Sequence, residues 1–206
     1  PVDICGTIHY DGVSFRYGYR KWVFQQVTFS VNEGEHVALT GTNGSGKSTL
    51  ARLLVGMHEP DTGIITIGGQ KISEIELECL RKHIIYVSQI PVLLSGTIRE
   101  GLLFGCTHSI NDELFERIAH GCGVDEIIRD NPFGYDWILT ENGMNVSGGH
   151  RQRIAIARAL LAEPDILILD EATSQIDRDL EEKILQFVFE YRKGKTILVI
   201  THNEKI

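Results

Sequence analysis

The chain has 206 residues, of which 42% are hydrophobic and 23% charged, and its formal net charge is −8 at pH 7. This length is sufficient for one domain with a well-developed core, with or without an inserted subdomain. The acidic balance argues against nucleic acid as the main partner. No stretch approaches the ~20 apolar residues of a membrane-spanning helix, and no signal peptide is recognisable. The first residue is Pro1 rather than Met, so we expect the chain to be a piece of a longer protein.

The cysteines predict free thiols rather than a zinc or redox site. None of the four belongs to a Cys-x-x-Cys pair, which is the spacing that such sites commonly use. Free thiols are typical of a reducing compartment. The four are Cys5, Cys79, Cys106 and Cys122.

In chain order, strands are predicted at residues 8–15, 27–31, 36–40, 64–67, 84–87, 166–169 and 196–200. Strands 36–40, 84–87, 166–169 and 196–200 are almost entirely apolar, as expected for central strands of a parallel sheet that is covered on both faces. The first strands alternate between apolar and polar residues, which favours an antiparallel layer.

Residues 95–161 change to helical periodicity, and the stretch that begins at Asn111 has an N-cap residue and an amphipathic face. We therefore expect an α/β fold with a parallel sheet, an N-terminal antiparallel β layer and an inserted helical subdomain. The expected boundaries are 1–94 and 162–206 for the core and 95–161 for the helical subdomain.

The stretch "GTNGSGKSTL" concentrates glycines between a predicted strand and a helix with apolar residues at Leu50, Leu53, Leu54 and Met57. Gly-x-x-x-x-Gly-Lys-Ser in this context is a phosphate-binding loop, because glycine lets backbone N–H groups surround an anion at a helix N-terminus. Lys47 would reach the β- and γ-phosphates, and Ser48 would bind Mg²⁺. The predicted nucleotide-binding residues here are Gly41, Thr42, Asn43, Gly44, Ser45, Gly46, Lys47, Ser48 and Thr49.

The stretch "PDILILDEATS" supplies the acidic partner for this metal. Its apolar strand ends in Asp170, which would hold Mg²⁺ directly or through water. Glu171 follows and can orient and deprotonate the attacking water. Alone, a strand that ends in aspartate is equally consistent with a helix cap; together with the glycine loop it predicts nucleotide hydrolysis.

A second anion cradle is predicted at Ser147, Gly148 and Gly149, at the start of an alanine-rich helix in "NVSGGHRQRIAIARALLAEP". A second cradle would be redundant if it bound the same phosphate as Lys47. The simplest interpretation is that it binds the nucleotide held by another chain. This combination of motifs resembles the ATP-binding-cassette (ABC) ATPases over nearly the whole chain. The resemblance implies a RecA-like P-loop NTPase core and two domains that enclose two ATP molecules head to tail.

The resemblance also assigns roles to single residues. Tyr17 in "VSFRYG" matches the aromatic residue that stacks on adenine, with Tyr19 and Trp22 as weaker substitutes. Gln89 matches the glutamine that senses Mg²⁺ and faces the membrane partner. Asp177 in "SQID" matches the aspartate that crosses the dimer interface, and His202 matches the histidine that contacts the γ-phosphate.

Three positions depart from the family pattern. His150 stands where glutamine is common, and Val146 where leucine is common. Gln175 replaces a small residue in "SQID", which leaves the details of the interface open.

The implied function is ATP binding and hydrolysis in an ABC exporter, with ATP and Mg²⁺ as ligands and Glu171, His202 and Lys47 in catalysis. Partners would be a second nucleotide-binding domain, in an ATP-dependent homodimer or a heterodimer, and membrane domains fused upstream. The location would be the cytoplasmic face of a membrane, the inner membrane in a bacterium. The exporter assignment depends on "SGTIREG" and on "TENG" with Glu141, which also resemble bacterial peptide or bacteriocin exporters.

Two alternatives remain at this point. One is a soluble ABC ATPase that acts on nucleic acid or ribosomes, although no sustained heptads lie between Lys47 and Ser147 and the charge is acidic. The other is an unrelated P-loop kinase or GTPase, although no Asn-Lys-x-Asp sequence for reading guanine is present.

Overall fold

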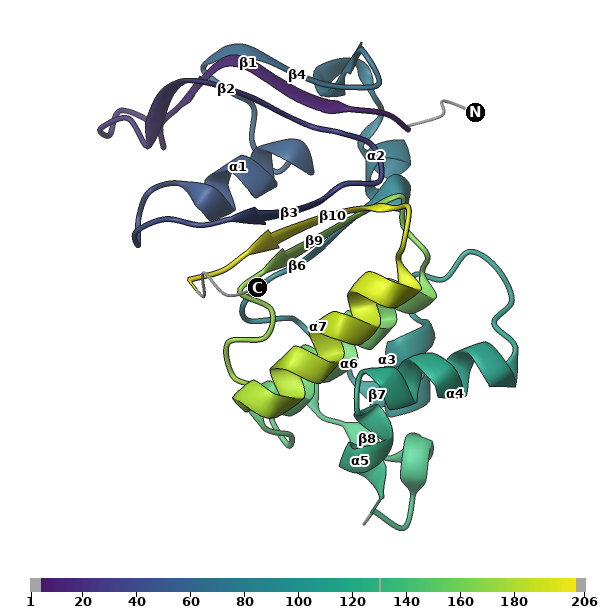
Figure 1. Ribbon diagram of the computed structural model, residues 1–206. Coiled ribbons are helices and arrows are strands. Elements are labelled where there is room, and N and C mark those ends of the chain that lie inside the picture. Colours follow the sequence, from purple (N-terminus) through teal and green to yellow (C-terminus); the bar gives the residue numbers. More distant parts are fainter. Residues whose placement is uncertain (1–4, 130, 203–206) are drawn as a thin grey trace. The chain divides into compact units, whose positions relative to one another are not determined.

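The computed structural model describes residues 5–129 and 131–202, and its residue contacts divide the chain into two units (Figure 1). The core unit comprises Pro1–Tyr86, Asp165–Asp170 and Lys193–Ile206, and the helical unit comprises Val87–Pro164 and Glu171–Arg192. These limits differ from the predicted domain boundaries, 1–94 and 162–206 against 95–161, which remain a prediction about domain organisation.

An antiparallel sheet forms one layer of the core unit, as the alternating strands predicted. Its strand order is β2-β1-β4-β5. The second strand starts earlier than predicted, at Phe24, because a bulge near Gln26, whose φ is 52°, lets pairing with Phe15 resume beyond it. The strands are β1 (Ile8–Phe15), β2 (Phe24–Val31), β4 (Thr62–Ile67) and β5 (Gln70–Lys71).

A second sheet of the core unit has the order β3-β10-β9-β6, in which β10 runs parallel to both β3 and β9. Every residue of β9 and β10 is buried, which confirms them as central strands. The expectation that the strands at 36–40 and 84–87 are central was wrong: β3 and β6 are the edge strands of this sheet, and β3 has exposed and half-buried residues. The strands are β3 (His36–Leu39), β6 (Ile84–Val87), β9 (Ile166–Asp170) and β10 (Thr196–Ile200).

Helix α1 (Lys47–Leu54) belongs to the same buried cluster as both sheets. Tyr10 of β1 donates a hydrogen bond to the Leu50 carbonyl on α1. The helix ends before Met57, because Gly56 adopts a φ of 67° and the N–H groups of Gly56 and Met57 bond back to Leu53 and Arg52. A short η1 (Ile72–Glu74) and α2 (Leu77–His83) lead into β6.

The helical unit contains the helices predicted between 95 and 161, together with α7. Asn111 caps its helix as predicted, accepting a hydrogen bond from the Leu114 N–H at 2.8 Å. A two-stranded sheet, β7 (Gly96–Thr97) with β8 (Ile138–Leu139), was not predicted, since strands this short carry no periodicity. The helices are α3 (Ile98–Leu103), α4 (Asp112–Gly121), α5 (Val124–Ile128), η2 (Gly134–Asp136), η3 (Glu141–Gly143), α6 (Gly148–Leu161) and α7 (Arg178–Tyr191).

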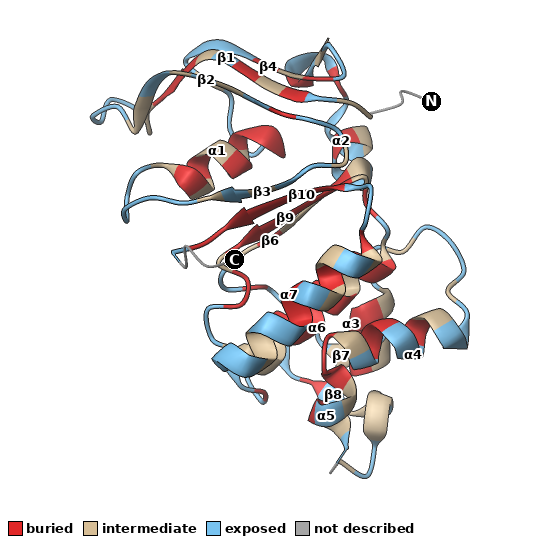
Figure 2. Ribbon diagram, in the orientation of Figure 1, coloured by how far each residue is buried: buried red, intermediate tan, exposed pale blue. Residues whose placement is uncertain are grey.

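Helix α6 is the most buried helix of its unit, with most of its residues from Gln152 to Leu161 shielded from solvent (Figure 2). Helices α4 and α7 approach closely at Gly121, where an added Cβ would lie 2.3 Å from the Phe187 ring. Among the residues that the structure describes, no helix has the length and apolar character needed to cross a membrane. As expected, no disulfide joins the cysteines of the described residues, and Cys122 is buried.

Candidate nucleotide-binding site

Within the core unit, three predicted site segments meet at one edge of the parallel sheet. The strand register places Leu39, Ile200 and Asp170 side by side at the carboxyl ends of β3, β10 and β9. The glycine loop continues from β3, and His202 follows β10. Ligands of open α/β sheets bind beyond the carboxyl ends of the strands, so the structure brings these predicted residues to the expected place.

The glycine loop has the backbone that its composition predicts. Gly44 and Gly46 have φ values of 79° and 95°, which favour glycine. An added Cβ at Gly46 would also lie 2.7 Å from the Phe24 ring. Lys47 is a buried residue that folds back over the loop, and its ammonium donates to the carbonyls of Gly41 at 2.8 Å and Thr42 at 3.1 Å. The positive charge is thereby held within the loop.

Two of the three predicted metal ligands, Ser48 and Asp170, are in contact with each other, whereas the third, Gln89, belongs to the helical unit. Ser48 Oγ donates to Asp170 Oδ1 at 2.9 Å, and only 4% of Asp170 is exposed. A hydroxyl and a carboxylate are hard oxygen donors of the kind that Mg²⁺ prefers, with waters to complete its octahedral shell. The residues present therefore fit a magnesium ion bound together with nucleotide phosphates.

Tyr86 is a site residue that sequence reasoning missed. Its hydroxyl donates to Asp170 Oδ2 at 2.5 Å, so both oxygens of this carboxylate have a protein partner. Burial, together with the hydrogen bond to Asp170, raises the pKa of Tyr86 to about 12, which keeps the phenol protonated as a donor. The available signal was its place at the end of an apolar strand shortly before Gln89.

Tyr17 lies beside the first turn of α1. Its hydroxyl is 3.1 Å from Thr49 Oγ1, and its half-buried ring meets Phe15 and His58 edge-on at centroid distances of 4.9 and 5.3 Å. By contrast, Tyr19 is fully exposed, and Trp22 lies under the Arg16 guanidinium at 4.6 Å. Tyr17 is thus the aromatic residue of this loop that contacts the phosphate-loop helix.

His202 is exposed and lies next to Thr201, whose N–H donates to the Leu39 carbonyl at 3.3 Å. This bond extends the pairing of β10 with β3 up to the residue where the glycine loop begins. His202 therefore follows directly from the sheet edge that carries the loop.

In the helical unit, Gln89 and Glu171 are paired. Gln89 Nε2 donates to Glu171 Oε2 at 2.6 Å. Glu171 has a φ of 49°, a left-handed conformation that is uncommon for residues other than glycine. Such a conformation persists only where the surrounding structure imposes it, and the role of this carboxylate as a base remains a prediction.

The predicted second anion cradle has the geometry of a capped helix start. Ser147 Oγ accepts a hydrogen bond from the His150 N–H at 3.1 Å, so Ser147 is the N-cap of α6. Burial and the nearby Arg153 lower the pKa of His150, which leaves its imidazole neutral at pH 7. The departure from glutamine at this position therefore adds no charge to the helix start.

Gln175, another of the three departures, lies against the two glycines of this cradle. A Cβ at Gly148 would be 1.5 Å from Gln175 Oε1, and a Cβ at Gly149 would be 2.6 Å from the Gln175 carbonyl oxygen. Close approach of backbone therefore requires glycine at position 149, whereas at position 148 the neighbouring atom is the end of a side chain. Asp177 is exposed at the N-cap of α7, and its side chain makes no capping hydrogen bond. The structure brings Gln175 to the cradle but assigns Asp177 no contact there.

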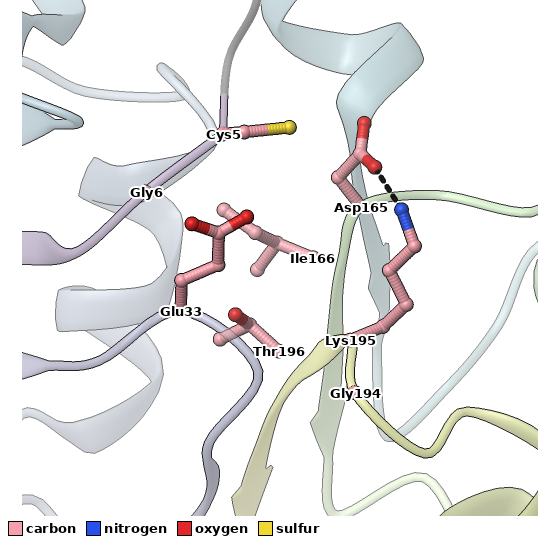
Figure 3. Close-up of a pocket in the computed structure, with 8 residues that line it drawn as sticks. All are labelled: Cys5, Gly6, Glu33, Asp165, Ile166, Gly194, Lys195 and Thr196. Carbon is pink, nitrogen blue, oxygen red and sulfur yellow. Dashed lines mark hydrogen bonds and ion pairs between the residues drawn. The ribbon is translucent and has the colours of Figure 1, made fainter.

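A polar pocket opens at the opposite, amino ends of β9 and β10 (Figure 3). Asp165 accepts hydrogen bonds there from Lys195 Nζ and from a His83 ring nitrogen, both at 2.6 Å. This place is remote from the carboxyl edge of the sheet, so the pocket is separate from the predicted nucleotide site. Its lining residues are Cys5, Gly6, Glu33, Asp165, Ile166, Gly194, Lys195 and Thr196.

Comparisons with known proteins agree with this arrangement. The family model described as "ABC transporter" matches residues 24–174. The ATP-dependent lipid A-core flippase of Alkalilimnicola ehrlichii is 40% identical over 96% of this chain and 34% of its own length. The lactococcin-G-processing and transport ATP-binding protein LagD of Lactococcus lactis is 42% identical over 97% of this chain and 28% of its own length.

A solved structure of a bacterial Atm1-family ABC exporter with ATP bound superposes with a TM-score of 0.92 at 34% identity, over 98% of this chain and 36% of that one. The chain thus spans about a third of the proteins that it matches. These similarities do not favour the soluble nucleic-acid or ribosome alternative. The glycine loop, the Ser48–Asp170 contact and the capped start of α6 agree with these similarities. The chain therefore belongs to the ABC transporter family, as a nucleotide-binding domain of the exporter type.

Proposed function

We propose that this chain binds ATP with Mg²⁺, hydrolyses it to ADP and phosphate, and thereby drives export across a membrane. The observation that supports this best is the contact of Ser48 with Asp170 beside a loop that already holds Lys47. This arrangement supplies a cation for the phosphates and oxygen ligands for magnesium. Bound Mg²⁺ would neutralise negative charge on the phosphates as the reaction proceeds.

The remaining roles belong to this chain's own side chains. Tyr17 stacks on adenine, Lys47 contacts the β- and γ-phosphates, and His202 holds the γ-phosphate. Glu171 orients the attacking water and accepts its proton. Catalysis in this scheme comes from positioning and charge stabilisation, without a covalent intermediate.

A second nucleotide-binding domain completes each site. Ser147, Gly148 and Gly149 of one domain would close over the γ-phosphate bound by the other, because N–H groups at a helix start favour anions. Asp177 would lie at this interface, and Gln89 would respond to the metal and to the membrane domains. We expect a homodimer, since both halves of a competent site are present in one chain.

The membrane domains would be fused upstream, which places this chain at the cytoplasmic face of the membrane. The likeness to LagD, named for processing and transport of lactococcin G, favours a peptide as cargo. The likeness to a lipid A-core flippase makes a lipid the competing cargo class. Transport assays in vesicles with each cargo class separate the two.

The decisive variant is Glu171→Gln. It preserves shape and removes only the base, so we expect ATP affinity within about 2-fold of wild type and turnover lowered at least ~100-fold. Binding is measured with a fluorescent ATP analogue and turnover by phosphate release. Glu74→Gln, which changes the same charge at an exposed surface pair with Lys71, serves as the control. Full turnover in Glu171→Gln would refute the assignment of the base.

A further inference from the structure

Gln152 of α6 is a fully buried polar side chain whose carboxamide bonds to two other segments of the helical unit, at Gln89 and at residues 171–175. Its Nε2 donates to the Gln89 carbonyl at 2.8 Å and to the Ser174 hydroxyl at 3.1 Å. The same nitrogen lies 3.5 Å from the Glu171 carbonyl. Its Oε1 accepts from the Gln175 N–H at 2.9 Å. The amide orientation follows from these partners, because acceptors face the nitrogen and a donor faces the oxygen.

Two of these partners are the residues whose side chains pair with each other. Gln89 and Glu171 meet at 2.6 Å through their side chains, while their backbone carbonyls both face Gln152 Nε2. Gln152 therefore contacts the backbone from which each member of the pair projects. A buried amide needs its hydrogen-bond partners, so this contact specifies where both backbones lie.

The conformation of Glu171 gives this contact further importance. Its φ of 49° is unfavourable for a residue with a side chain and persists only where the surroundings impose it. The Ser174 N–H donates to the Glu171 carbonyl at 3.1 Å, which closes a tight turn. Gln152 Nε2 donates to the Ser174 hydroxyl at one end of that turn and lies 3.5 Å from the Glu171 carbonyl at the other.

The oxygen of the Gln152 carboxamide is connected to the glycine cradle through Gln175. The Gln175 N–H that bonds to Gln152 belongs to the residue that covers Gly148 and Gly149. These glycines begin the helix that carries Gln152. One side chain thus links the start of α6, the Glu171 turn and the Gln89 segment.

We propose that Gln152 is a positioning residue for ATP hydrolysis, which holds Gln89 and Glu171 in register and ties both to the glycine cradle through Gln175. This inference depends on the proposed function, in which Glu171 is the base. Gln152 acts through these residues and does not touch the nucleotide.

The first test is Gln152→Met in the intact protein, because methionine has a similar volume and an unbranched side chain without these hydrogen bonds. We expect kcat to fall at least ~10-fold while KM for ATP stays within about 2-fold, since only positioning of the base is lost. Ile154→Val is the matched control. It removes buried volume from the same helix and should leave kcat within about 2-fold of wild type.

A second variant gives a signature that a purely structural role would not produce. In Gln152→Glu the ionised carboxylate can still accept from the Gln175 N–H but repels the carbonyls of Gln89 and Glu171. Once protonated, its O–H can donate to the Gln89 carbonyl, and burial raises the pKa of such a carboxyl. The ratio of variant to wild-type kcat should therefore increase as the pH falls from about 8 to about 6.

These experiments distinguish a failure of the proposed function from a failure of the positioning role of Gln152. Absence of ATPase activity in the wild-type protein, or full turnover in Glu171→Gln, overturns the proposed function. If wild-type turnover and its loss in Glu171→Gln are established, an unchanged kcat in Gln152→Met overturns only the positioning role. An equal loss of kcat in Ile154→Val, or a pH-independent ratio in Gln152→Glu, does the same.

Discussion

Single side chains around Asp170 show how the carboxylate of the proposed metal site is held in place. Both carboxylate oxygens accept hydrogen bonds, one from Ser48 and one from Tyr86. Ser48 was predicted from the glycine loop, but Tyr86 was not. We infer that the Tyr86 hydroxyl fixes the orientation of the Asp170 carboxylate, because hydrogen-bond partners of metal ligands generally orient them.

We therefore predict that Tyr86→Phe weakens the response to Mg²⁺. Loss of the hydroxyl lets the Asp170 carboxylate rotate, so half-maximal ATPase activity should need about 10-fold more Mg²⁺. A titration of activity against Mg²⁺ at saturating ATP measures this. Tyr19→Phe, at a fully exposed position, is the control, and an equal shift in that variant would contradict the role of Tyr86.

At the level of elements, the two glycines at the start of α6 face different parts of Gln175. Gly148 meets the mobile end of its side chain, whereas Gly149 meets its backbone carbonyl. We expect Gly149→Ala to lower the free energy of unfolding by about 1–3 kcal/mol, since backbone must move. Gly148→Ala should cost clearly less, because a side chain can turn away. Urea unfolding of both variants measures the difference, and the reverse order would refute this account.

Three elements of the core unit are joined by Asp165, which contacts His83 at the end of α2 and Lys195 before β10. Burial tends to raise the pKa of Asp165, but the hydrogen bonds from Lys195 and His83 outweigh it and hold this pKa below its usual value. A depressed carboxyl pKa stabilises the fold above the unfolded value of about 3.9, and this stabilisation is lost as the pH falls through the lower folded value.

Asp165→Asn should accordingly reduce the free energy of unfolding by about 1–2 kcal/mol at pH 7. The difference from wild type should stay constant down to about pH 5 and shrink below about pH 4, where the carboxyl of the unfolded chain begins to protonate while the folded one stays ionised. Urea unfolding across this pH range tests the prediction. Asp11→Asn, at an exposed position of β1, should show a smaller cost, and a pH-independent cost in Asp165→Asn would argue against the ionic contact.

At the scale of the whole molecule, the proposed head-to-tail dimer predicts complementation between two inactive variants. Lys47→Ala removes the phosphate-binding cation. Ser147→Glu places a negative charge at the helix start, which the helix tolerates but a partner's phosphate does not. In a mixed dimer, one of the two shared sites keeps both Lys47 and Ser147.

Co-expression of the two variants, in the intact protein, should therefore restore about a quarter of the wild-type ATPase activity, because half of the dimers are mixed and each has one competent site. Each variant alone should be inactive. Phosphate release from the co-purified mixture measures the recovery. A mixture as inactive as either parent would contradict independent sites shared between two chains.

Much of the candidate site followed from local patterns. Gly44 and Gly46 have the positive φ values that a phosphate loop needs, and a strand ending in Asp170 was visible as an apolar run. The edge position of β3 and the early start of β2 could not be predicted in this way. Strand order and bulges depend on pairing between distant residues, which a local pattern does not record.

The sequence by itself predicted the glycine loop, the proposed metal ligands and the class of fold, because these depend on residue type at short spacing. Only the tertiary structure showed which side chains fix the positions of these site residues. Tyr86 meets Asp170, Gln175 covers the glycines of α6, and Gln152 joins Gln89 to the Glu171 turn. These contacts join residues far apart in the chain, and a buried hydrogen-bond network becomes specific only when every partner has been brought into place by folding.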